Sequence, residues 1–134
     1  MGLDQYAYTA PKELVGDQQV DIKGLFQDGA EIEGVDTGFY YWRKFNALHG
    51  WMEQLYYKKG GTDQSFNCST VRVDKEDLDR LEDDMLNNKL KPVEGFFFGA
   101  SEIFPEDIEE LKDFIKKARQ AIEDGYVVIY DSWW

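Results

Sequence analysis

The stretch from Pro105 to Tyr130 constrains the fold more than any other part of this chain. Apolar side chains recur there at three- and four-residue steps, the pattern of a helix with one buried face: Ile108, Leu111, Phe114, Ile115, Ala118 and Ile122. Pro105 suits the first turn of such a helix and Gly125 its end. Residues 126–130 (YVVIY) then have the composition of a buried strand. This succession predicts a helical layer packed on a sheet.

Two further helices are predicted upstream. One covers about Trp42 to Lys58, where apolar residues recur with helical spacing before Gly60 and Gly61: Phe45, Leu48, Met52, Leu55 and Tyr56. The other begins after Asp74, an N-cap residue followed by an acidic first turn, and its apolar stripe is Leu78, Leu81 and Met85.

Strands are predicted where apolar and polar residues alternate over short distances. Residues 3–8 and 68–73 show this alternation, and residues 95–99 place three phenylalanines between two glycines. Residues 12–38, rich in Gly, Asp and Gln, are expected to form loops with at most one weak hairpin. The sequence therefore predicts an α+β fold with about three helices on a small, mostly antiparallel sheet, whose strand order stays open.

Length and composition bound the organisation and the compartment. The chain has 134 residues and shows no linker or repeat, so residues 1–134 are expected to form one domain. Cys68 is the only cysteine, no long apolar run follows Met1, and no segment has the apolar length of a membrane span. We therefore expect a soluble protein in the cytoplasm, with no membrane contact.

Charge is unevenly distributed along the chain. The net charge is −12, but residues 37–73 carry five basic and two acidic side chains around the only histidine. Much of this segment is also aromatic. Charge segregated in this way predicts a positive patch that attracts a small anionic ligand or an acidic partner segment.

The predicted helix at 42–58 carries the candidate site. Its second stripe, at three- and four-residue steps, offers a stacking ring, an amide, a group that titrates near neutral pH and a carboxylate: Trp42, Asn46, His49 and Glu53. Arg43 and Lys44 add two cations for an anion. The alternative is structural, with Trp42 at the edge of the core and His49 satisfied by the backbone.

The terminal pair Trp133 and Trp134 allows two interpretations. The rings either close the core beside the strand at 126–130 or form a stacking platform for a base or a partner side chain.

Several classes of site find no support in the sequence. It contains no glycine-rich phosphate loop, zinc-ligand spacing or nucleophile elbow, so no cofactor or metal is expected. The acidic residues of 77–84 lack the spacing of a calcium loop and are expected to be solvated. The charge of −12 disfavours direct binding of nucleic acid.

Four segments together resemble a family of small uncharacterised proteins encoded by bacteriophages and some bacteria. They are the opening MGLDQY, the YWRK and LHGWM motifs at 41–52, GFFFG at 95–99 and the terminal SWW. Relatives are sometimes labelled phosphoglycerate kinase, but that enzyme is a much longer two-domain protein and its nucleotide site is not visible here. The resemblance implies a phage-type accessory protein and assigns no catalytic residue.

Two functional hypotheses follow. In the first, a non-catalytic accessory protein binds a host protein or a small anionic ligand through the basic aromatic helix at 42–58; in a variant, acidic residues of 74–84 and 102–124 mimic nucleic acid. In the second, a small enzyme acts on a phosphorylated or carboxylated metabolite, with His49 as general base, Arg43 as anion clamp and Glu53 orienting the ring. Oligomeric state stays open.

Overall fold

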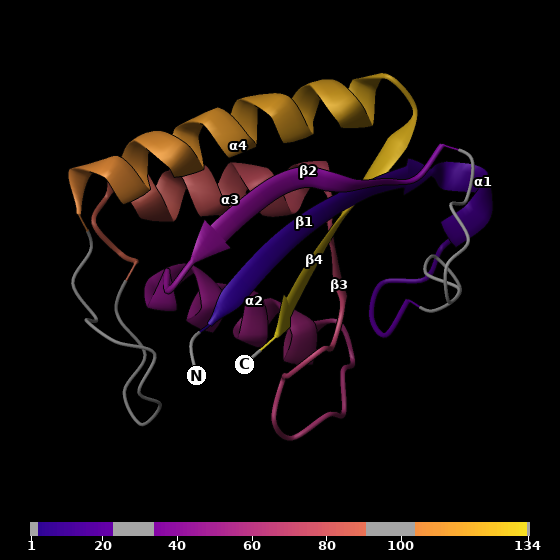
Figure 1. Ribbon diagram of the computed structural model, residues 1–134, viewed down its shortest axis with the longest axis horizontal. Helices are drawn as coiled ribbons and strands as arrows, with labels where there is room; N and C mark the ends of the chain where they lie inside the picture. Colours follow the sequence, from indigo (N-terminus) through magenta and orange to yellow (C-terminus); the bar gives the residue numbers. More distant parts are fainter. Residues whose placement is uncertain (1–2, 23–33, 91–103, 134) are drawn as a thin grey trace.

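Two strands from opposite ends of the sequence form the centre of the sheet. The computed structural model describes residues 3–22, 34–90 and 104–133 (Figure 1). Strands β1 (Asp4–Pro11), β2 (Asp36–Arg43), β3 (Val71–Val73) and β4 (Tyr126–Trp133) are arranged in the order β2-β1-β4-β3. Every neighbouring pair is antiparallel. The predicted α+β class and antiparallel sheet are confirmed.

Three helices cover one side of this sheet. They are α2 (Asn46–Lys58), α3 (Lys75–Leu86) and α4 (Pro105–Glu123), whereas the short α1 (Lys12–Val15) lies at one end (Figure 1). The described chain therefore has four helices rather than the three predicted. The additional α1 has four residues, too few to produce a helical periodicity in the sequence.

The main core lies between the sheet and the three long helices. Ala7, Trp42, Val128 and Tyr130 face it from the sheet, and each is at most 2% exposed. Each helix adds its apolar stripe, in agreement with the predicted periodicity: Leu48, Met52 and Leu55 from α2, Leu78, Leu81 and Met85 from α3, and Leu111, Phe114, Ile115 and Ala118 from α4.

A second, smaller core covers part of the opposite side of the sheet. It joins Tyr8, Ala10, Val127 and Ile129 of β1 and β4 to a short group at the α1 end, Val15 and Ile22. Antiparallel sheets commonly pack one face and leave part of the other uncovered. Within the described residues, this second core covers only the end of the sheet nearest α1.

The two edges of the sheet differ. Residues 19–21 run along β3: Arg72 N–H donates to the Gln19 carbonyl at 2.7 Å, and Asp21 N–H donates to the Thr70 carbonyl at 2.9 Å. At the other edge, β2 carries an irregularity between the pairs Ala7–Tyr40 and Thr9–Asp36. Such bulges bend an edge strand and make continued pairing with another chain less favourable.

The predicted helix ends are partly confirmed. Asp74 precedes α3, and its backbone N–H donates to Asp77 Oδ2 at 2.9 Å in a capping box. Gly125 follows α4 with φ of +94°, a conformation that favours glycine. The predicted start of the first helix at Trp42 is wrong, because α2 begins at Asn46 and Trp42 lies in β2.

Three other strand and loop predictions have different outcomes. The strand at 3–8 is confirmed and extends to Pro11, whereas the strand expected at 68–73 is restricted to Val71–Val73; Cys68, with φ of +61°, is not extended. The loop prediction for 12–38 missed α1 and the start of β2. Residues 95–99 lie outside the described residues.

Candidate functional site

Trp42 is part of the core rather than of an open stripe. It lies in β2, is 2% exposed, and packs edge-on against Phe114 with ring centroids 4.7 Å apart. Its indole N–H has no hydrogen-bond partner among the described residues. The ring is therefore unavailable for stacking on a ligand without rearrangement of the core.

His49 and Asn46 also point inward. His49 is 4% exposed, its Nδ1 lies 2.8 Å from the Tyr130 hydroxyl, and its ring centroid lies 5.1 Å from that of Phe66. Burial lowers its pKa from 6.5 to about 4, so the imidazole is neutral at neutral pH. Asn46 is 5% exposed. His49 is thus buried, and its Nδ1 contacts a side-chain hydroxyl, whereas the structural alternative named the backbone as its partner.

A buried glutamine completes the surroundings of Tyr130. Gln5 Nε2 donates to the Tyr130 hydroxyl at 3.0 Å and to the Phe45 carbonyl at 3.1 Å, while Gln5 Oε1 accepts from Phe45 N–H at 2.8 Å. These bonds join the start of α2 to the centre of the sheet. They hold His49 in a polar network within the core, away from any surface hollow described below.

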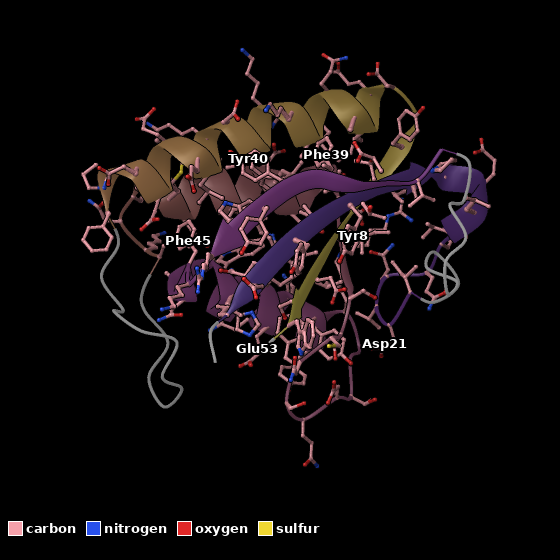
Figure 2. The ribbon with its side chains drawn as sticks, in the orientation of Figure 1. Tyr8, Asp21, Phe39, Tyr40, Phe45 and Glu53 are labelled. Carbon is pink, nitrogen blue, oxygen red and sulfur yellow. The ribbon has the colours of Figure 1, made fainter. Side chains whose placement is uncertain are left out.

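Glu53 remains at the surface of α2, half-buried (Figure 2). Burial raises the pKa of its carboxyl. The predicted stripe is therefore divided: Trp42 belongs to a strand, Asn46 and His49 belong to the core, and only Glu53 meets solvent.

The cations of residues 37–73 are also dispersed. Lys59 is 2.6 Å from an Asp77 oxygen, and Arg72 Nε is 2.7 Å from an Asp74 oxygen, so both are in ion pairs. Arg43 and Lys44 are exposed before α2, while Lys58 is exposed at its other end. A helix of 13 residues spans roughly 20 Å. The structure does not gather these charges into one anion site.

Arg43 nevertheless lies beside Trp133, another candidate from the sequence analysis, and beside residues of β1 and β2 that the sequence analysis did not select. In the register of the sheet, Asp4 of β1 is opposite Arg43 of β2 on one side and opposite Trp133 of β4 on the other. Two residues along β1, Tyr6 is opposite Tyr41. Side chains two apart on a strand share a face. We call these five residues, Asp4, Tyr6, Tyr41, Arg43 and Trp133, the open sheet face.

The exposure of the open sheet face distinguishes it from the rest of the sheet. Tyr41 is 50% exposed and Trp133 is 66% exposed, and Arg43 is exposed beside them. It lies on the side of the sheet away from α2, α3 and α4, beyond the second core (Figure 1). Trp133 therefore does not close the core, contrary to one of its two interpretations. Trp134 lies outside the described residues.

Hydrogen bonds and ring contacts fix the positions of the tyrosines. The Tyr41 hydroxyl donates to Asp4 Oδ1 at 2.5 Å, and this bond raises the pKa of Tyr41. The Tyr6 ring lies 5.3 Å from that of Tyr41 and 6.2 Å from that of Tyr8, measured between centroids. Tyr8 in turn donates to Asp131 at 3.2 Å. These contacts hold the tyrosine rings in place.

Asp131 borders the open sheet face and is largely withdrawn from water. It accepts from the Tyr8 hydroxyl and, at 2.8 Å, from the backbone N–H of Ser132. Burial nevertheless raises its pKa above the ordinary value of 3.8. The carboxylates of this region therefore bind neighbouring donors, whereas the side chain of Arg43 forms no hydrogen bond or ion pair with the described residues.

No family model, curated protein or solved structure matches this chain. Function must therefore be argued from the site itself. In the described ranges, no helix is long and apolar enough to cross a membrane, and no group of three or more His, Cys, Asp or Glu side chains is arranged to hold a metal ion.

Three of the acidic residues of α3 form ion pairs. Asp79 and Glu82 are both bound by Arg119 of α4, each at 2.8 Å, and Asp77 is bound by Lys59 and Arg80. These ion pairs join α3 to α4 and to the end of α2. Part of the charge that would be needed to imitate rows of phosphate is thus neutralised within the protein.

Sequence reasoning identified Arg43 and Trp133 but missed Asp4, Tyr6 and Tyr41. The alternation of Asp4, Tyr6 and Tyr8 with Leu3, Gln5 and Ala7 was visible as a strand pattern. The polar and aromatic set was not recognised as a surface, because sequence does not show which face of a sheet the helices cover. Tyr41 was missed because no strand was predicted just before the helix expected at 42–58, whereas β2 covers Asp36–Arg43.

Proposed function

We propose that this protein is a non-catalytic binding module that docks a partner protein on the open sheet face. One observation carries the proposal: Tyr41 and Trp133 are 50% and 66% exposed on the same side of the sheet, with Arg43 beside them. Contiguous exposed rings on a soluble protein commonly indicate an interaction surface.

The residue types favour a protein over a small molecule as partner. Tyrosine, tryptophan and arginine are the residues most enriched at the energetic centres of protein interfaces. The open sheet face presents all three on adjacent strands, side by side rather than around a hollow. Its tyrosines are already held by Asp4 and by one another, so binding orders few side chains.

The charges indicate what the partner presents. Asp4 accepts from Tyr41 and Asp131 accepts from Tyr8, but the Arg43 guanidinium forms no hydrogen bond or ion pair with the described residues. A guanidinium in this position suits a carboxylate, which it can bind through two parallel hydrogen bonds. The partner therefore presents an acidic side chain next to an apolar one. If the protein acts as the phage-type accessory protein that it resembles, the partner is a host protein.

The enzymatic alternative has weaker support. A general base must come within hydrogen-bonding distance of its substrate, but His49 is 4% exposed and its ring is packed against Phe66 and Tyr130. Arg43 and Glu53 are exposed or half-buried on different elements, and three hollows of the described surface are lined by other residues.

Site-specific photocrosslinking tests the proposal. A photoreactive phenylalanine analogue replaces Tyr41 in one variant and Tyr57 in a matched control, because Tyr57 is 41% exposed on α2, away from the open sheet face. Both are irradiated in a lysate of cells that express the protein. We expect a discrete protein adduct from position 41 that is lost when Arg43→Glu is added, and none from position 57. Equal adducts from both positions, or an adduct indifferent to Arg43→Glu, would contradict the assignment.

A further inference from the structure

A concave site lies on the helix-covered side of the sheet, away from the open sheet face. A hollow of about 400 Å³ opens between the C-terminal half of α4 and the first residues of β2 and β4. This volume falls within the range of small-molecule sites. Its lining is Thr9, Gly34, Asp36, Phe39, Lys117, Gln120, Ala121, Asp124 and Tyr126. Figure 2 shows Phe39 on β2 next to α4.

The free charges of this hollow are negative. Asp36 and Asp124 each accept one hydrogen bond, from Gly38 N–H at 3.0 Å and from Gln120 Nε2 at 3.1 Å, and neither has an ion-pair partner in the described structure. The only cation of the lining, Lys117, is already bound: its ammonium lies 3.1 Å from Asp113 Oδ2. A cationic ligand would find two carboxylates with unused oxygens.

The end of α4 adds to this negative potential. The C-terminal end of a helix carries the negative end of its dipole, and a basic residue in the last turn usually offsets it. The last turn of α4 contains no basic residue, and Glu123 and Asp124 stand there instead. This arrangement costs stability in the free protein, and a bound cation relieves it.

A hydroxyl group in the wall of the hollow is available to a ligand. Thr9 forms part of the wall and is 6% exposed, yet its side chain makes no hydrogen bond within the described residues. The Thr9 hydroxyl is not among the fully buried side-chain atoms that lack a partner, so it keeps contact with the hollow and can bind a ligand there. Phe39, Ala121 and Tyr126 provide apolar surface around it. The hollow thus combines carboxylates, apolar walls and one unused hydroxyl.

We propose that this hollow binds a small organic cation, an amine or guanidinium carried on an aromatic or aliphatic body. The charged group lies between Asp36 and Asp124 at the end of α4. The body packs on Phe39, Ala121 and Tyr126, and a polar atom reaches Thr9. The site is separate from the open sheet face, so its test does not depend on that proposal.

Titration followed by amide NMR tests the site with defined probes. The probes are 2-phenylethylamine and agmatine, with 2-phenylethanol as the neutral match and phenylacetate as the anionic match. We expect saturable shifts at residues 117–126 with the amines alone. Asp36→Asn and Asp124→Asn should each raise the dissociation constant by about tenfold, because each removes a charged partner. Glu123→Gln, the neighbouring acid outside the lining, should leave it unchanged.

Thr9→Val provides a second variant of nearly equal shape. Tyramine carries a phenol hydroxyl that 2-phenylethylamine lacks. Thr9→Val should weaken the binding of tyramine by about threefold or more and leave the binding of 2-phenylethylamine unchanged. Absence of saturable shifts with every amine, equal binding of the alcohol, or unchanged affinity in both aspartate variants would overturn the proposal.

Discussion

The burial of His49 makes the stability of this protein dependent on pH in a calculable way. In the folded protein the pKa of His49 is lowered from 6.5 to about 4, because burial disfavours the charged imidazolium. Between these two values the unfolded chain binds a proton that the folded chain does not. The free energy of unfolding contributed by His49 is therefore highest above pH 6.5 and is lost as the pH falls toward 4.

The expected magnitude follows from the two pKa values. Between pH 7 and pH 5, proton linkage gives a loss of roughly 2 kcal/mol, and this value depends mainly on the pKa of the unfolded chain. The assay is urea denaturation at both pH values, for the wild type and for His49→Gln, which has no titrating ring. The change in unfolding free energy of His49→Gln between the two pH values is subtracted from that of the wild type. The difference removes the contribution of the other titrating groups, which both proteins share. The pH values stay above the isoelectric point of about 4.4.

Two outcomes would contradict this reasoning. The wild type and His49→Gln would lose the same free energy between pH 7 and pH 5, or the carbon-bound imidazole protons of the folded protein would titrate near pH 6.5. The NMR titration uses the wild type alone, so it remains decisive if His49→Gln does not fold.

Two further predictions concern other carboxylates. Burial raises the folded pKa of Asp131, so the stability that this group contributes is present below pH 3.8 and is lost as the pH rises through its folded pKa. Asp131→Asn should therefore gain stability relative to the wild type from pH 4 toward pH 7. Urea denaturation that shows the opposite trend would contradict this. Asp74 caps α3 and forms an ion pair with Arg72, so Asp74→Ala should lower the free energy of unfolding by about 0.5–2 kcal/mol. The control is Lys75→Ala at the next position, which should lower it by less than half as much.

The helices of this protein could be predicted because their signals are local. The stripe of α4 from Leu111 to Ala118, the cap at Asp74 and the glycine at position 125 each act within a few residues, and all three were found where expected. The strand at 126–130 followed from the same reasoning. Local patterns therefore recovered the α+β class.

The start of α2 could not be predicted because its apolar pattern continues into a strand. Trp42 and Phe45 are spaced like residues of one helical face, and both are buried in the main core. What separates them is the pairing of β2 with β1, in which Gln5 lies opposite Trp42. That partner is far away in the sequence, so local periodicity gave the wrong assignment.

The candidate site lies on the open sheet face rather than on the helix predicted at 42–58, again because of contacts between residues far apart in the sequence. Arg43 and Trp133 were identified from residue type alone, but Asp4, which lies between them, joins them only through the sheet register. His49 drew attention as the only histidine. Its burial depends on Phe66 and Tyr130, and no sequence pattern connects those residues to it.

The pairing of β1 with β4 has a consequence for synthesis of the chain. Asp4 and its register partner Trp133 are far apart in the sequence, so they pair only after both have left the ribosome, whereas β2 needs only β1 to pair. Such distant pairing slows folding because a long loop must close first. The open sheet face, which takes residues from β1, β2 and β4, is therefore complete only after Trp133 has been synthesised and paired with β1.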